Sequence, residues 1–192
     1  MEIKKRNFQI HADRMADMPR SNVKHGNFHH SAGNPMATAA GINRWHIDGR
    51  GWAGIGYHFV IDAEGTIYQG RDLTKEGVHA GRPANGNSWA ICLLGNFENY
   101  APTEEQYKSS QWLWDHLNKI KKITPQEHRD HMATACPGKY LDLKEATKPL
   151  PKEDEVFHRV VTGSFLDRKK AERRVRELER AGFQSFITTF KK

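Results

Sequence analysis

Apolar and polar residues follow one another along the chain in a way that predicts strands interleaved with helices. The segments YHFVI and TIYQ are rich in β-branched and aromatic residues, and the short turn DAEG between them predicts a hairpin. The continuous apolar run SWAICLLGNF is typical of a strand that is covered on both faces. An earlier strand is predicted within NVKHGNFHHSAG, although this segment has few apolar residues.

Two further segments have the spacing of amphipathic helices. In MATAAGINRWHIDG the apolar side chains of one face are Ala39, Ala40, Ile42 and Trp45. Gly49 follows the expected end of this helix. In the second helix, which includes QWLWDHLNKIKKI, the apolar positions are Leu113, Leu117 and Ile120. Thr103, with Gln106 three residues later, predicts a capping box at its start. We therefore expect an α/β fold with a mixed central β-sheet flanked by helices.

A short polar segment divides the chain. KPLPKEDE, residues 148–155, has two prolines and mixed charges, and it predicts an exposed linker between a main domain, residues 1–147, and a tail, residues 156–192. In the tail, EVFHRVVTGSF and FQSFITTF are strand-like, and DRKKAERRVRELERAG between them predicts a helix. We expect a small βαβ unit there, which is marginal as a fold of its own.

Composition limits where the protein can act. The chain has 192 residues, of which 37% are hydrophobic, and this suffices for one ordinary core with a small appendage. No stretch approaches the roughly 18 apolar residues that a membrane span needs, and no apolar segment of a signal peptide follows the basic start. We therefore expect synthesis in the cytoplasm without a signal peptide, and no membrane partner.

The charge is unevenly distributed between the two parts. The net charge of +7 favours an anionic partner, such as a nucleic acid, a membrane surface or an acidic polymer. Residues 148–192 have 12 Lys and Arg against 7 Asp and Glu, whereas residues 1–147 have 18 against 16. Because the main domain is nearly neutral and has no basic-aromatic recognition motif, we expect no nucleic-acid partner.

Candidate metal ligands are concentrated in EHRDHMATACPGKY, a segment too broken by Pro and Gly to be a helix. Cys136 and His128, eight residues apart, could supply a thiolate and an imidazole to one zinc ion, and FHHSAG is the obvious source of a third ligand. His131 competes with His128 for this role. Three protein ligands leave zinc a fourth position for water, which is typical of a catalytic site.

Several motifs occur in series: HHSAG, GRGWAGIGYHFVIDAEGTIYQGR, GVHAGRPANGNSWAICLLGNF, PTEEQ and HRDHMATACPG. In this order and at these separations they resemble the zinc N-acetylmuramoyl-L-alanine amidases of the peptidoglycan recognition protein and bacteriophage lysozyme type. The resemblance covers roughly residues 20–145. It implies the amidase fold, a zinc cofactor and peptidoglycan as substrate.

The resemblance also implies roles for single residues. The metal ligands by this matching are His29, His128 and Cys136. Tyr57, in GIGYHF, and Thr134, two residues before the cysteine, match positions that flank the zinc. Tyr57 is then a hydrogen-bond donor to the oxyanion, and Thr134 a weaker donor. One branch of the family has a glutamate on the strand that carries Cys92 here, so the general base stays unassigned.

Other residues in these motifs have simpler expected roles. His58 is expected to pack against the sheet or hydrogen-bond with it, and Cys92 to lie in the core. His79 belongs either to the substrate cleft or to the support of its loop. Arg71 pairs either with a substrate carboxylate or near Asp72. The histidines expected on the surface are His11, His25, His46, His116 and His158.

We therefore expect a peptidoglycan hydrolase that cleaves the amide bond between N-acetylmuramic acid and L-alanine with a zinc-activated water. It would act as a phage endolysin or bacterial autolysin, reaching the wall through a holin or lysis. The alternative is a non-catalytic peptidoglycan-binding protein. The tail resembles the first half of a SPOR module, which implies peptidoglycan binding, and its basic helix suits anionic wall polymers.

Overall fold

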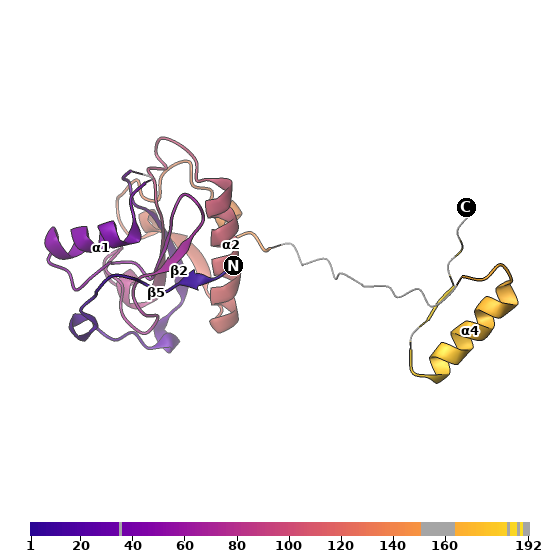
Figure 1. Cartoon of the computed structure of the whole chain (residues 1–192). Helices are drawn as coiled ribbons and strands as arrows, with labels where there is room; N and C mark the ends of the chain where they lie inside the picture. Colours follow the sequence, from indigo (N-terminus) through magenta and orange to yellow (C-terminus); the bar gives the residue numbers. More distant parts are fainter. Residues whose placement is uncertain (35, 151–163, 184, 188, 190–192) are drawn as a thin grey trace. The chain divides into compact units, whose positions relative to one another are not determined.

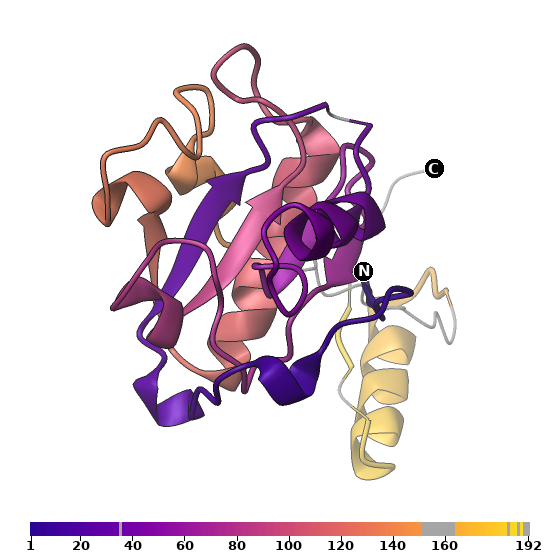
Figure 2. The ribbon, with the colours of Figure 1, turned by 90° about the vertical axis from the view of Figure 1, so that its left-hand side faces the viewer.

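Six strands form one mixed sheet in the order β1-β4-β3-β5-β2-β6 (Figures 1 and 2). Their bounds are β1 Ile3–Lys4, β2 His25–His30, β3 Phe59–Ile61, β4 Ile67–Gln69, β5 Ser88–Leu93 and β6 Thr124–Glu127. Only the hairpin of β3 and β4 is antiparallel among the described strands, and all other neighbours are parallel. The predicted α/β fold with a mixed sheet is confirmed.

The computed structural model describes residues 1–34, 36–150, 164–183, 185–187 and 189. Contacts divide the chain into two units, Met1–Leu150 and Pro151–Lys192. The described α-helices are α1 Ala39–Asp48, α2 Glu104–Ile120, α3 Leu143–Ala146 and α4 Arg168–Arg180. Four short 3₁₀ turns are η1 Ala12–Arg14, η2 Arg20–Asn22, η3 Ala84–Gly86 and η4 His128–Asp130. None of the helices in the described ranges is long and apolar enough to cross a membrane.

The sheet lies between α1 and α2, which cover opposite faces (Figures 1 and 2). The larger core lies on the α2 face and includes Phe28, Trp89, Ile91, Leu113 and Leu117. The smaller core lies on the α1 face and is formed by Ala39, Ile55, Val60, Cys92 and Leu94. Because side chains alternate along a strand, β5 contributes to both cores. This explains why SWAICLLGNF is apolar throughout.

Strand β2 forms despite its polar sequence because its two faces have different neighbours. Phe28 is fully buried on the α2 face, and its ring lies 5.9 Å from that of Trp114. Gly26 is on the same face, where any Cβ would contact the Trp114 ring. The alternate residues His25, Asn27 and His29 are on the other face, which α1 covers. The low apolar content therefore reflects the site that this strand supports.

Helix α1 ends before Gly49 as predicted, and Ala39 and Ile42 of the predicted face pack in the core, but the rest of the buried face differs. Trp45 is 54% exposed, whereas Asn43 and His46 are buried. The Asn43 side chain accepts the Ile55 N–H at 2.8 Å, and the His46 ring accepts the Gly56 N–H at 3.2 Å. Both predictions, that Trp45 is on the core face and that His46 is on the surface, are wrong. Polar side chains anchor this helix to the neighbouring loop.

Helix α2 follows its sequence pattern closely. The capping box of Thr103 and Gln106 is present, and Leu113 and Leu117 are fully buried. Ile120, the last residue of the helix, is 37% exposed and so is not a core position. The sequence did not predict β1, β6 or α3, and β6 has no apolar residue in TPQE other than its proline.

In the tail, helix α4 is confirmed and begins at the cap Asp167, whose carboxylate accepts the N–H groups of Lys169 and Lys170. The strand predicted at residues 155–165 lies outside the described residues up to position 163. The described residues of FQSFITTF are not part of a strand. The linker predicted at residues 148–155 also lies outside the described residues from position 151 onward.

Candidate metal centre

The parallel pairing of β2 with β6 brings two histidines together. Phe28 lies opposite Glu127 in this register, so the next residues, His29 and His128, are neighbours at the carboxyl ends of the two strands. Their ring centroids are 4.7 Å apart. The chain turns into η4 at His128, whose imidazole lies next to that of His29.

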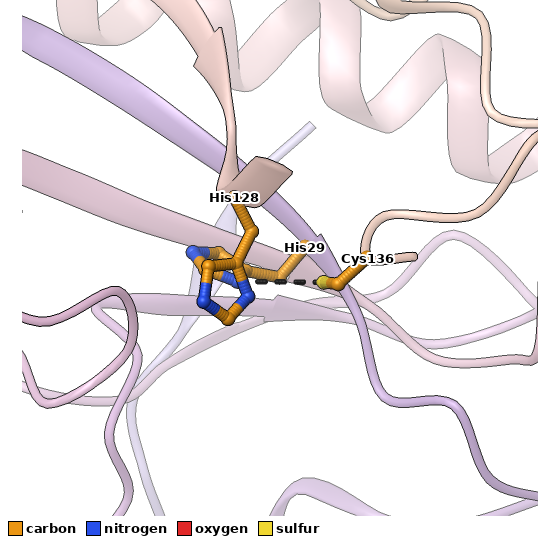
Figure 3. A group of neighbouring side chains, drawn as sticks. All are labelled: His29, His128 and Cys136. Atoms are coloured by element: carbon orange, nitrogen blue, oxygen red, sulfur yellow. Dashed lines mark hydrogen bonds between the residues drawn. The ribbon is translucent and has the colours of Figure 1, made fainter. Parts of the chain in front are cut away.

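Cys136 completes the group from the loop that follows η4 (Figure 3). The Arg129 N–H donates to the carbonyl of Cys136 at 3.1 Å, which holds the loop against the turn. The Cys136 Sγ lies 3.6 Å from Nδ1 of His29. One ligand atom from each of the three residues lies within 4.8 Å of the other two. The structure therefore brings His29 together with His128 and Cys136, which are far from it in sequence.

Burial sets the protonation states of these groups. His29 is 1% exposed, and burial lowers the pKa of its imidazole well below the ordinary value, with His128 lowering it further. Burial likewise lowers the pKa of the His128 imidazole, with a further contribution from His131. Burial raises the pKa of the Cys136 thiol to about 11. The imidazoles are therefore neutral, as metal binding requires, and a cation must displace the thiol proton.

The donor set fits zinc. Two imidazoles and one thiolate are ligands that Zn²⁺ prefers, with bonds of about 2.0–2.1 Å to nitrogen and about 2.3 Å to sulfur. Two such ligands on a tetrahedral ion are separated by about 3.6 Å, which matches the distance of 3.6 Å from Sγ of Cys136 to Nδ1 of His29. Nε2 of His128 is buried and has no hydrogen-bond partner among the described residues.

A pocket of about 400 Å³ opens beside this group. Its lining residues are His30, Ala32, Tyr57, Asn96, Glu98, His128, Thr134, Ala135 and Cys136. Tyr57 and Thr134, the residues expected to flank the metal, thus lie at the same pocket as the ligand candidates His128 and Cys136. The Thr134 hydroxyl oxygen accepts the Cys136 N–H at 3.2 Å, so its own proton is available to another acceptor.

Tyr57 packs against the candidate ligands. Its ring centroid lies 5.2 Å from that of His29 and 5.7 Å from that of His46. Burial raises the pKa of the Tyr57 hydroxyl well above its ordinary value, and its neighbours Cys92 and Cys136 raise it further. The hydroxyl therefore keeps its proton at neutral pH and can donate.

Two predicted structural roles are confirmed. Cys92 is fully buried in the core on the α1 face. His58 is also fully buried: its Nδ1 accepts the Ala90 N–H at 2.9 Å, and its Nε2 lies 2.9 Å from the Lys75 carbonyl. Both residues support the sheet beneath the site.

The structure adds to two of the open alternatives. Arg71 is 3% exposed and donates to the carbonyls of Ile55 and Glu76, so it neither reaches the pocket nor pairs with Asp72. His79 places its Nδ1 3.0 Å from Nε2 of His29. The motif GVHAGRPANGN marked this residue, but its contact with a ligand candidate could not be read from the sequence.

His131, the competing ligand, is not part of the group of potential metal ligands found among the described residues. His128 and His131 are three residues apart at a 3₁₀ turn and so lie on one side of it. Nε2 of His131 is buried without a hydrogen-bond partner among the described residues. The structure favours His128 as the ligand, because His128 is grouped with His29 and Cys136 and His131 is not.

Comparisons with known proteins agree with the geometry. The sequence pattern of the Amidase_2 family, described as N-acetylmuramoyl-L-alanine amidase, matches residues 19–139. Peptidoglycan-recognition protein SC2 of Drosophila melanogaster is 34% identical over 121 residues, which are 57% of this chain and 65% of that protein. The endolysin of Escherichia phage T7 is 34% identical over 110 residues, covering 54% of this chain and 70% of the endolysin.

Solved structures give the same result. An endolysin N-acetylmuramoyl-L-alanine amidase from Clostridium intestinale has a TM-score of 0.68 and 32% identity, covering 76% of this chain and 92% of that one. Drosophila peptidoglycan recognition protein SD has a TM-score of 0.68 and 26% identity, covering 73% of this chain and 90% of that one. The chain spans 65% of the length of the fly SC2 proteins and 70% of that of the phage endolysins that it matches.

Proposed function

Because the chain belongs to the Amidase_2 family of N-acetylmuramoyl-L-alanine amidases, we propose that it hydrolyses the amide bond between N-acetylmuramic acid and L-alanine in peptidoglycan. The observation that carries this proposal is the meeting of His29, His128 and Cys136 beside a pocket that also presents Tyr57 and Thr134. Relatives named endolysin support action on the cell wall, and we propose that the protein reaches it after release by a holin or by lysis.

We propose that the metal is zinc, held by two neutral imidazoles and one thiolate. Bound zinc supplies a Lewis acid for the amide carbonyl and lowers the pKa of a water molecule toward about 7. The chain itself contributes the ligand geometry: β2 and β6 fix His29 and His128, and the loop after η4 fixes Cys136. The pocket leaves the side of the site that faces Tyr57 and Thr134 open to substrate.

The chain also contributes proton donors to the developing oxyanion. Tyr57 keeps its hydroxyl proton at neutral pH, and it lines the pocket next to Cys136. A donor aimed at the oxyanion of an amide-hydrolysis intermediate contributes about 2.7–4 kcal/mol to catalysis. The Thr134 hydroxyl accepts the Cys136 N–H and so also supports the loop, and we assign it a smaller part, as a second donor or in positioning water.

Purified muropeptides test the function directly. We expect mass spectrometry of the products to show free stem peptides that begin with L-alanine, together with sugars that retain the lactyl group. A strong chelator should abolish this cleavage, and added zinc should restore it, because an open three-ligand site exchanges its metal. Cleavage that survives complete removal of metal contradicts the zinc mechanism.

The same experiment separates catalysis from the alternative, a peptidoglycan-binding protein without activity. That alternative is supported by the peptidoglycan-recognition proteins among the relatives. A non-catalytic protein would bind muropeptides in the pocket but release no stem peptide at any zinc concentration. The complete set of ligand candidates favours the enzyme.

We propose that the tail, residues 156–192, binds the cell wall. Its helix α4 is strongly basic, with the cationic side chains Arg168, Lys169, Lys170, Arg173, Arg174, Arg176 and Arg180. Such a helix suits anionic wall polymers. The resemblance to the first half of a SPOR module rests on sequence alone, and the wall-binding role needs only the charge.

Removing the tail tests this role. A protein that ends at Leu150, the last residue of the first unit, should cleave small soluble muropeptides about as fast as the full chain, because every proposed ligand and donor lies before that point. It should sediment less with purified walls. The difference should shrink as salt rises, since exposed charges are screened beyond roughly 10 Å at 0.1 M ionic strength.

Equal sedimentation of both proteins across the salt series contradicts a targeting role. If the shortened protein loses cleavage of soluble muropeptides, the tail supports the catalytic unit instead.

A further inference from the structure

His29 is held on both sides of its ring. Its Nδ1 faces the Cys136 Sγ at 3.6 Å, and its Nε2 lies 3.0 Å from Nδ1 of His79. The rings of His29 and His79 meet edge to face, with centroids 4.9 Å apart and an interplanar angle of 82°. His79 therefore contacts the nitrogen of His29 that points away from the candidate metal position.

The direction of this hydrogen bond follows from the ligand role of His29. A metal, or the Cys136 thiol proton, requires an unprotonated Nδ1, so the proton of the neutral His29 ring is on Nε2. Nε2–H then donates to His79, whose Nδ1 must be the acceptor. A neutral His79 with an accepting Nδ1 carries its own proton on Nε2.

The next residue in this series accepts that proton. Nε2 of His79 is 3.5 Å from Oγ of Ser88, a long contact, and the Ser88 hydroxyl donates to the Ala84 carbonyl at 2.6 Å. Because the hydroxyl proton is committed to Ala84, a lone pair of Ser88 faces His79. The bonds run in one direction, from His29 through His79 and Ser88 to a backbone carbonyl.

The loop around His79 holds its ring in this place. The Asn85 side-chain oxygen accepts the N–H groups of His79 at 2.9 Å and of Ala80 at 3.0 Å. Gly77 passes so close to the His79 ring that a Cβ at this position would collide with it. His79 also stays away from the chemistry, since it is not among the residues that line the pocket.

We propose that His79 is a positioning residue of the metal centre: it accepts the Nε2 proton of His29 and so fixes the tautomer and ring orientation that present Nδ1 to the metal. This inference rests on the proposed zinc centre. Partners of this kind behind a metal-binding histidine typically change metal affinity by about 10- to 100-fold. His79 acts on zinc binding through His29 and does not contact substrate.

Two amide substitutions at this position separate the acceptor from the bulk of the side chain. In His79→Asn, the amide oxygen can take the place of Nδ1 and still accept from His29. In His79→Gln, the amide is one bond further out, near the place of Nε2, and this acceptor is lost. His25→Gln is the matched control. His25 is on β2, as His29 is, but its ring hydrogen-bonds with Thr124 and not with a candidate ligand.

Zinc affinity, measured by competition with a chromophoric chelator, is the main readout. We expect His79→Gln to weaken zinc binding by about 10- to 100-fold, His79→Asn to weaken it less, and His25→Gln to leave it unchanged. Thermal unfolding of the metal-free proteins checks the loop, since a purely structural role would lower the melting temperature without separating the two variants in zinc affinity. In the zinc-loaded parent, ¹⁵N NMR should place the proton of both His29 and His79 on Nε2.

The outcomes distinguish this inference from the proposed function. A parent protein that binds no zinc overturns both. If the parent binds zinc and neither His79 variant binds it more weakly, the positioning role alone is wrong. A proton on Nδ1 of His79, or tighter zinc binding by His79→Gln than by His79→Asn, also overturns it.

Discussion

Replacing Cys136 by serine is expected to remove both zinc and amidase activity. The Cys136 Sγ is the only candidate ligand atom that can become an anion at this centre, and it lies 3.6 Å from Nδ1 of His29. The C–O bond of serine is shorter than the C–S bond of cysteine, and the serine hydroxyl does not ionise under conditions in which a metal-bound thiol does. A structural zinc site contributes about 10–16 kcal/mol in total, and if three or four ligands share it equally, the loss of one weakens binding by roughly 10²- to 10⁴-fold. Metal analysis after dialysis, together with muropeptide cleavage, measures both effects.

Cys92→Ser is the matched control, since it changes the chain's other cysteine in the same way. Cys92 is fully buried on β5, in the core on the α1 face. A hydroxyl placed there should lower the free energy of unfolding by about 1–3 kcal/mol and leave the zinc content unchanged. If Cys92→Ser loses zinc while Cys136→Ser keeps it, the ligand assignment is wrong.

The spacing of apolar residues predicted those elements that bury apolar side chains in the core. The hairpin of β3 and β4, the central strand β5 and helix α2 all bury apolar side chains, and each was found where the sequence indicated. Strand β6 gave no such signal. Its sequence TPQE pairs only with β2 at the edge of the sheet, and its residues are exposed or half-buried, so neither alternation nor apolar content marks it.

The candidate ligands could be chosen from sequence, but the reason that they meet could not. A His and a Cys eight residues apart, and the HHSAG motif, identify His29, His128 and Cys136 only through a family resemblance. Their meeting depends on the register that places Phe28 opposite Glu127, and no local pattern specifies a register between strands so far apart in the chain.

Buried polar residues were the hardest to predict. His46 was expected on the surface, yet its ring accepts a backbone N–H from the loop before β3. His79 was expected to act in the cleft or in its loop, yet it contacts His29. The sequence does not distinguish a solvent-exposed histidine from a histidine that hydrogen-bonds with a buried group. Only the neighbours in the tertiary structure show which of the two it is.

Tyr57→Phe is expected to keep zinc and lose turnover. Phenylalanine preserves the ring that packs against His29 and His46, at centroid distances of 5.2 and 5.7 Å, so the ligands stay in place. It removes the hydroxyl of this side chain, which burial keeps protonated, from a residue that lines the pocket. Loss of a donor that acts on the oxyanion should lower kcat by about 10²- to 10³-fold with little change in KM. Steady-state cleavage of a soluble muropeptide by the zinc-loaded variant measures it.

Thr134→Ala tests whether this effect is specific to Tyr57. Both residues line the pocket, but the Thr134 hydroxyl oxygen already accepts the Cys136 N–H at 3.2 Å and serves the loop as well as the substrate. We therefore expect a smaller loss of turnover for Thr134→Ala than for Tyr57→Phe, again with zinc retained. Unchanged turnover of zinc-loaded Tyr57→Phe would reduce Tyr57 to a packing residue. Loss of zinc from either variant would mean that its hydroxyl supports the ligands, because a donor that acts only on the oxyanion has no effect on the metal when no substrate is bound.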